Sequence, residues 1–421
     1  MAAFRAMPRW LITLLALAAF AMAAIALGNI VLKAYADGAF SNPRWGHDLT
    51  QWWQGGSLLI QRRDPYTTIV PSAAPVLLLL APLAYAPWGA ATLIWAATNL
   101  LLAVACVWCM GALAHIPPRS GQGLLLLGLF LALIATRQVI ELGQISLLIA
   151  ACTLGALLLE RDRPWLAGVL LGIAISKYTM SLPVLLVALL AGRWKVVAGC
   201  VATQVLALLA VALIAWTSPL VIIGEYLGYS TMIMGQTQGY AIHLLSLGWG
   251  PLGPLALALA TLALAALLGR WLLRPHAMAA IRASGLASLT LAGALTIWSM
   301  CAVYHGRQDM VLSFLFVPIA LGRTNHGADG YRLPPRAANA LAAFTWATAL
   351  YWCMPGYVVL GMPAYRSLYA LLNVAICLVW ATLLFTIPIN TQEAPFNHQD
   401  TKARRGNTLF KHQDTKAPRK K

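Results

Sequence analysis

Residues 144–179 read QISLLIAACTLGALLLERDRPWLAGVLLGIAISKYT, which is two apolar runs joined by a charged turn. Polar residues bound the pair, with Gln144 before the first run and Ser176-Lys177 after the second. Similar apolar runs recur between residues 10 and 388. Because about 20 apolar residues in a helix span a bilayer, the pattern predicts an all-α polytopic integral membrane protein.

The composition excludes a water-soluble globular domain. Of the 421 residues, 60% are hydrophobic and 10% are charged, and the mean hydropathy is +0.74, whereas soluble domains carry about 25% charged residues. The net charge of +17 indicates basic cytoplasmic loops, so no nucleic-acid partner is expected. The seven cysteines lie in or beside apolar runs, and Cys106-x-x-Cys109 is interpreted as packing rather than as a metal or redox pair.

The basic residues set the predicted topology. The run 10–32 is expected to be an uncleaved first helix, and the proline-interrupted run 73–87 to be re-entrant or interfacial. Twelve spans with both termini in the cytoplasm place 21 of the 29 Lys and Arg residues inside and 8 outside, whereas counting 73–87 as a span reverses this bias. The later predicted spans are 91–111, 121–136, 145–160, 165–176, 182–192, 195–217, 252–272, 284–303, 309–322, 337–354 and 367–388.

The prediction divides the chain into two parts. Residues 1–388 form the membrane domain, and 33–72 are its first outer loop. Residues 389–421 are expected to be a disordered, basic, cytoplasmic tail in which the hexapeptide HQDTKA occurs twice, beginning at 398 and 412. The basic residues of the tail are expected to contact anionic membrane lipids.

Five polar clusters reach the outer face in this topology. Ionisable residues at membrane depth are costly and usually functional, so clusters on one face predict a single aqueous cavity that opens outward. The clusters are the loop 33–72 with Asp48 and Arg62 to Tyr66, the stretch from Arg137 to Gln144, the stretch from Ser176 to Thr179 at the tip of a short helical hairpin, the loop 218–250 with Glu225 and Tyr226, and the stretch from Tyr304 to Asp309.

Each cluster also has an ordinary structural interpretation. Asp48 fits a loop carboxylate, and the tryptophans near it, Trp52 among them, fit an amphipathic helix lying on the membrane. Gln144 fits a cap of the helix 145–160, and Asp309 fits the start of a helix whose dipole it complements. Lys177 fits a snorkelling lysine, although it points to the side that positive charge avoids.

Four stretches occur in order over about residues 10–320. They are Asp48 with Gln51-Trp52-Trp53, Asp64-Pro65-Tyr66 and the proline-rich run 74–83; Gly143-Gln144 before a helix; Arg163 to Lys177; and Tyr304-His305-x-Arg307-x-Asp309. In this order they resemble glycosyltransferase family 87, membrane enzymes of the GT-C fold that use polyprenyl-phosphate sugars. The chain departs from the family at Tyr178, where proline often follows the lysine, and at Leu49-Thr50, where aromatic residues often follow the aspartate.

The resemblance implies a GT-C-like fold of about twelve transmembrane helices in the cell (inner or plasma) membrane. It also implies transfer of a sugar, mannose in many members, outside the cytoplasm to a lipid or glycan acceptor. Asp48 would be the general base and Lys177 would contact the lipid phosphate. His305, Arg307, Asp309 and Arg137 would line the donor and phosphate site, Gln144 would support it, and Asp64, Tyr66 and Trp52 would support the acceptor side or the loop.

The chemistry of these residue types is consistent with that assignment. A carboxylate that takes the proton of a sugar hydroxyl contributes about 10²–10⁴-fold, and cations stabilise a leaving phosphate in a low-dielectric site. Inversion needs one base, whereas a covalent intermediate needs a second carboxylate nearby, for which Asp64 and Asp309 are candidates. Inversion is favoured. Without Asp-x-Asp or metal-ligand spacing in the sequence, metal-independent chemistry without a cofactor is expected.

Two other functions fit the same residues. A transporter or flippase would account for the hairpin 165–192, which resembles a broken helix, and for charges within the membrane, although the polar clusters lie on one face rather than near the midplane. A non-enzymatic scaffold leaves the outward-facing Lys177, His305 and Arg307 unexplained.

Overall fold

The computed structural model describes the chain mainly between residues 8 and 316, and the described regular structure is all helical. No strand occurs within these described parts, which confirms the all-α prediction for them. His305, the tail 389–421 and most of the predicted spans 337–354 and 367–388 lie outside the described residues. The described residues are 8–36, 46–68, 70, 73–236, 252–273, 278, 281–282, 285–302, 307–316, 343–344, 347–348, 351, 372, 375–376 and 378–382.

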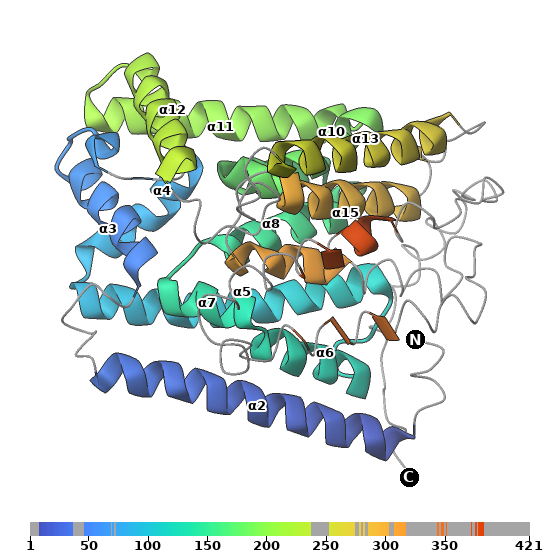
Figure 1. Ribbon diagram of the computed structural model, residues 1–421. Helices are drawn as coiled ribbons and strands as arrows, with labels where there is room; N and C mark the ends of the chain where they lie inside the picture. The colour runs from blue at the N-terminus through green and yellow to red at the C-terminus, as the bar shows by residue number, and fades with distance from the viewer. Residues whose placement is uncertain are drawn as a thin grey trace, which may run out of the picture.

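Long apolar helices frame the molecule. In Figure 1, α2 (Arg9–Ala36), α5 (Trp88–Ala114) and α11 (Trp194–Ala215) lie with their axes roughly parallel, with α5 running opposite to the other two and shorter helices between them. Within the described residues, the four segments long and apolar enough to cross a membrane are 10–32, 88–114, 164–190 and 194–215, and one bent pair of helices adds a fifth. The chain is therefore a multi-pass membrane protein, and the total of twelve spans stays a prediction.

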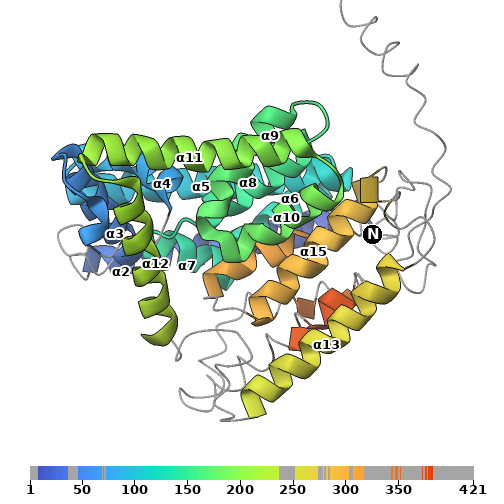
Figure 2. The same ribbon diagram turned by 90° about the horizontal axis from the view of Figure 1, so that it is seen from above.

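The other described elements are mostly shorter than a bilayer span. They are α3 (His47–Ile60), η1 (Pro65–Thr67), α4 (Ala74–Leu80), η2 (Ala81–Tyr85), α6 (Gly121–Ala132), α7 (Ile134–Leu142), α8 (Ser146–Leu159), α9 (Pro164–Ala174), η3 (Ile175–Lys177), α10 (Tyr178–Leu190), α12 (Pro219–Gln236), α13 (Leu252–Leu272), α15 (Gly285–Ala302) and η5 (Arg307–Asp309). Figure 2 shows α3, α4 and α12 gathered at one end of the bundle.

The predicted outer loop 33–72 contains a packed helix. The helix α3 lies against α4 and η2, and together α4 and η2 are too short to span a bilayer, as expected for the run 73–87. Trp52 is only 1% exposed, so the interpretation of this tryptophan as an interfacial residue is wrong. Its large apolar ring belongs to the buried face of α3 and packs into the core. The opposite face of the helix is the exposed one.

The predicted span 121–136 also differs from the structure. The helix α6 ends at Ala132, and α7 continues at an angle of 55° after Leu133, whose ψ of 135° breaks the helical path. Arg137, expected in a polar loop, is a helical residue of α7. Its neighbours Val139 and Ile140 are buried, which shows that the polar stretch 137–144 is largely an amphipathic helix rather than a surface loop.

The elements α9 and α10 form the predicted helical hairpin, with η3 at its tip. Glu160 before α9 is paired with Arg193 after α10, so the two open ends of the hairpin are adjacent. Ser181 Oγ donates to the carbonyl of Ala174 at 2.8 Å, whereas residues seven apart in a continuous helix are separated by about 10 Å. The segment 164–190, which has the length and composition of a single span, therefore folds back at its middle into two shorter arms, and Lys177 lies at the turn.

Candidate active site

The first part of the site joins α3 to the turn between α7 and α8. Gly143 ends α7 with a φ of 69°, and a Cβ atom there would lie 2.8 Å from the Cβ atom of Leu49 in α3. The N–H of Gly46 donates to the carbonyl of Glu141 at 3.0 Å. This close packing brings Gln144 to Asp48, and Gln144 Nε2 donates a hydrogen bond to Asp48 Oδ2.

The second part of the site lies at the tip of the hairpin. Lys177 Nζ is 2.5 Å from Asp309 Oδ1 and 3.0 Å from Ser146 Oγ. Ser146 Oγ donates to the same Asp309 oxygen at 2.6 Å. The side chain of Asp309 is 3% exposed and that of Lys177 is 21% exposed. The carboxylate is therefore sealed in the interior, while the ammonium group keeps an open side.

Electrostatics connect the two parts. Burial raises the pKa of Asp48 above its ordinary value, and this effect outweighs the hydrogen bond from Gln144 and the charge of Lys177, which both lower that pKa. The charge of Asp309 adds to the increase. A buried carboxyl with a raised pKa is a better proton acceptor than an exposed one. The arrangement can therefore accept a proton at Asp48 while it holds a cation nearby.

Residues 74–299, more than half of the chain, match the sequence model of glycosyltransferase family 87. The chain belongs to glycosyltransferase family 87. The predicted resemblance is thereby confirmed, and membership makes the chain a membrane glycosyltransferase. Neither a curated protein nor a solved structure matches the chain.

The family 87 region and the candidate site overlap only in part. Gln144, Ser146 and Lys177 lie within the matched residues, whereas Asp48 and Asp309 lie outside them. The fold brings all five together through α3, the turn between α7 and α8, the hairpin tip and η5. The candidate site is therefore assembled from segments far apart in the sequence.

Two residues assigned to the loop make local contacts in this glycosyltransferase. Asp64 caps η1 by accepting a hydrogen bond from the N–H of Tyr66 at 2.9 Å. The Tyr66 ring is buried and meets Tyr226 of α12 edge to face, with ring centroids 6.2 Å apart. These contacts tie residues 64–66 to α12. The acceptor role of Asp64, Tyr66 and Trp52 stays a prediction.

Three basic residues besides Lys177 are predicted around the donor: Arg137, His305 and Arg307. Arg137 is half-buried on α7, a helix that packs against η5. The backbone of Arg307 belongs to η5, and His305 lies outside the described residues. The structure therefore brings Asp48, Gln144, Lys177 and Asp309 together, and it places Arg137 on an element that contacts the Asp309 segment.

Ser146 joins this cluster although its position in the sequence did not indicate it. Its hydroxyl is fully buried and touches both Lys177 and Asp309. A serine in the first turn of a helix usually indicates capping, so its position two residues after Gln144 gave no sign of a link to the site. The alternative interpretation of Gln144 as a helix cap is wrong, because its side chain bonds Asp48 while Ile145 occupies the N-cap of α8.

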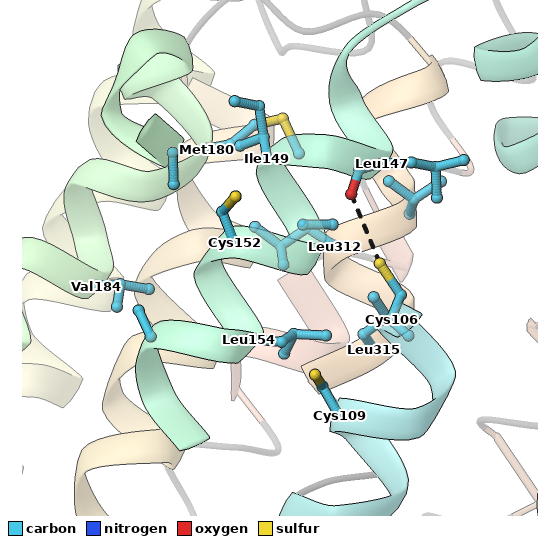
Figure 3. Packing of buried hydrophobic residues seen from close by; sticks show 14 of the residues in the cluster. Cys106, Cys109, Leu147, Ile149, Cys152, Leu154, Met180, Val184, Leu312 and Leu315 are labelled. Carbon is cyan, nitrogen blue, oxygen red and sulfur yellow. Dashed lines mark hydrogen bonds between the residues drawn. The ribbon is translucent and has the colours of Figure 1, made fainter. Parts of the chain in front are cut away.

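Metal ligation has no candidate in the part of the chain that the structure describes. No group of three His, Cys, Asp or Glu side chains there could hold a metal ion. Within the same part, Cys106 and Cys109 are free, buried thiols. They pack against α8 and other apolar side chains (Figure 3), in agreement with the interpretation of this pair as packing.

Proposed function

We propose that this family 87 enzyme moves a sugar, most simply mannose, from a polyprenyl-phosphate donor to a hydroxyl of a lipid or glycan acceptor. The reaction takes place on the outer side of the cell (inner or plasma) membrane. The observation that supports it is the meeting of a buried carboxyl, Asp48, with the ammonium group of Lys177 in one site. A base and a cation are the two groups that this transfer requires.

Asp48 acts as the general base. Gln144 holds its Oδ2 atom, which leaves Oδ1 to accept the proton of the acceptor hydroxyl. The hydroxyl oxygen forms a bond to the anomeric carbon as the bond from that carbon to the phosphate oxygen breaks. The phosphate leaves with the electron pair, and the anomeric configuration is inverted.

Lys177 stabilises the leaving phosphate. An ammonium group has three hydrogen-bond donors, and two of them are directed to Ser146 and Asp309. The third remains on the open side of the lysine, where a lipid phosphate can accept it. A cation held in place before the reaction stabilises developing negative charge in a low-dielectric site.

The surroundings of Asp309 favour inversion over a covalent intermediate. A nucleophilic carboxylate has to reach the anomeric carbon, but the side chain of Asp309 is 3% exposed and its Oδ1 already accepts from Lys177 and Ser146. Its role in this mechanism is to hold the lysine. The mechanism needs no metal ion, and no cofactor other than the donor substrate is proposed.

The proposed topology has twelve spans and both termini in the cytoplasm. The pair of Glu160 and Arg193 lies at the open end of the hairpin, and Lys177 lies at the tip. The two therefore mark opposite ends of α9 and α10. Basic residues concentrate near the open end, at Arg161, Arg163 and Lys195, which supports placing that end in the cytoplasm and the site toward the outside.

The direct test is Asp48→Asn in the full-length enzyme, assayed in membranes with polyprenyl-phosphate mannose. We expect transfer to fall about 10²–10⁴-fold because the amide cannot take the proton. Asp162→Asn is the matched control, since Asp162 is an exposed carboxylate in the turn at the other end of the hairpin. A stable Asp48→Asn variant with near-normal transfer would reject the base assignment. Substrate flux in liposomes without product would favour the transporter alternative.

A further inference from the structure

One face of α5 lies against the turn that carries the site. Trp95 Nε1 donates to the carbonyl of Gly143 at 2.8 Å, and Cys106 Sγ donates to the carbonyl of Leu147 at 3.6 Å (Figure 3). Asn99 follows Trp95 by four residues and precedes Cys106 by seven. With 3.6 residues per turn, all three side chains lie within about 40° of one another around the helix. Asn99 therefore faces residues 143–147.

The amide of Asn99 is sealed in this interior. The residue is 0% exposed, and neither its oxygen nor its nitrogen has a hydrogen-bond partner among the described residues. Folded proteins rarely leave both ends of a buried amide unsatisfied, because the loss of hydration is then uncompensated. Thr136 on α7 also has a buried hydroxyl without a partner among the described residues. The interior of the described helices thus holds buried polar groups that lack protein partners there.

The start of α8 adds N–H donors that its own helix cannot satisfy. The first N–H groups of a helix have no partner within the helix, and Ile145 at the N-cap has no polar side chain to accept from them. The side chains on either side are engaged elsewhere, Gln144 with Asp48 and Ser146 with Asp309. Ser146 and Leu147 are 0% exposed, so bulk water does not reach this helix end.

We propose that Asn99 and the first turn of α8 bind a buried, ordered water molecule. Such waters make about three hydrogen bonds to buried polar groups that lack protein partners. The water accepts from a helix N–H group, and the amide of Asn99, which both donates and accepts, completes its shell. The water fixes the turn between α7 and α8, so Asn99 is a positioning residue that acts through Gln144 and Ser146. This positioning role rests on the proposed function, whereas the water site itself does not.

Asn99→Leu in the full-length enzyme tests both the water site and the positioning role, because leucine has a similar size and its side chain cannot hydrogen-bond a water molecule. If the water is present, the variant loses it and leaves the helix end unsatisfied. The melting temperature then falls, and kcat falls about 10–100-fold with little change in KM, as expected when a remote change misplaces catalytic groups. Asn99→Ser, which keeps a polar group and leaves room for water, retains most of the activity.

The neighbouring Thr98 provides the matched control. Its hydroxyl bonds the carbonyl of Ile94 within its own helix at 2.8 Å, so Thr98→Val leaves the melting temperature and kcat unchanged. If Asn99 is instead a dry, unsatisfied amide, Asn99→Leu raises the melting temperature, and that result overturns the water site. A cryo-EM map without density between the Asn99 amide and the start of α8 overturns it as well.

The readouts separate the two proposals. A lower melting temperature with unchanged kcat and KM overturns the positioning role and leaves the water site in place. If the wild-type enzyme shows no sugar transfer while the water density and the drop in melting temperature are both observed, the proposed function fails and the water site stands.

Discussion

The two carboxylates of the site have different partners. Asp48 accepts from the neutral amide of Gln144, and burial raises its pKa. Asp309 receives an ammonium group and a hydroxyl on a single oxygen. A neutral donor leaves a carboxylate free to gain a proton, whereas a bound cation favours the charged form. The difference indicates that Asp48 is suited to accept a proton and Asp309 to hold a cation.

One short turn supports both carboxylates. Gln144, which bonds Asp48, and Ser146, which bonds Asp309, are two residues apart between α7 and α8. The distance between the base and the cation therefore depends on the conformation of this turn. Changes to the partners of each carboxylate test whether the two roles differ.

The largest effect is expected from Lys177→Met. This variant removes the cation from a buried carboxylate, so we expect a loss of stability of about 3–5 kcal/mol. Transfer is expected to fall by about 10²–10³-fold because the leaving phosphate loses its cation. Thermal unfolding and steady-state kinetics of the purified enzyme measure the two losses.

The double variant Lys177→Met with Asp309→Asn separates stability from chemistry. Removing both charges should restore much of the stability, because no buried charge is left without its counter-ion. Activity should stay low, since the phosphate still has no cation. Recovery of transfer in the double variant would show that Lys177 is only a structural partner of Asp309.

A smaller effect is expected from Ser146→Ala. The ion pair of Lys177 and Asp309 remains, but both partners lose the hydroxyl that orients them. We expect a loss of stability of about 1–3 kcal/mol and a drop in kcat of about tenfold. Ser181→Ala is the control, because this serine is equally buried but bonds the hairpin backbone at Ala174. Equal effects of both variants on kcat would contradict a specific role for Ser146.

Part of this arrangement was predictable from the sequence. The apolar run 91–111 predicted α5, observed as Trp88–Ala114, and the polar tip of the hairpin placed Lys177 at a turn. Hydrophobic periodicity and helix-breaking residues are local signals. Such local signals locate helices and turns along the chain, as they did for α5 and for the tip of the hairpin.

The rest depended on contacts that the sequence does not encode locally. Ser146 meets Asp309 across 163 positions, and a serine at a helix start looks the same whether it caps the helix or serves a site. Trp52 was placed at the membrane interface because tryptophan is common both there and in cores. The bend at Leu133 has no proline or glycine to indicate it.

The pH dependence of transfer gives a finer test of Asp48. The base is active when deprotonated, so kcat/KM falls as the pH drops below the pKa of Asp48. Gln144→Leu removes a hydrogen bond that lowers this pKa, so the acidic limb should move to higher pH, with a loss of about fivefold on that limb. Asp309→Asn removes a charge that raises the pKa and should move the limb to lower pH. Identical profiles would show that Asp48 does not control the limb.

The smallest effect is expected at Asp64, the other candidate for a second carboxylate near the sugar. Asp64→Ala removes a cap worth about 1 kcal/mol, but Thr67 and Thr68 still bond the backbone carbonyls of Asp64 and Pro65. Because η1 keeps these contacts, we expect transfer within about twofold of wild type. Asp64→Asn keeps the accepting oxygen and should match wild type in thermal unfolding. A loss of transfer as large as that of Asp48→Asn would mean that two carboxylates share the chemistry, and the single-base mechanism would then be wrong.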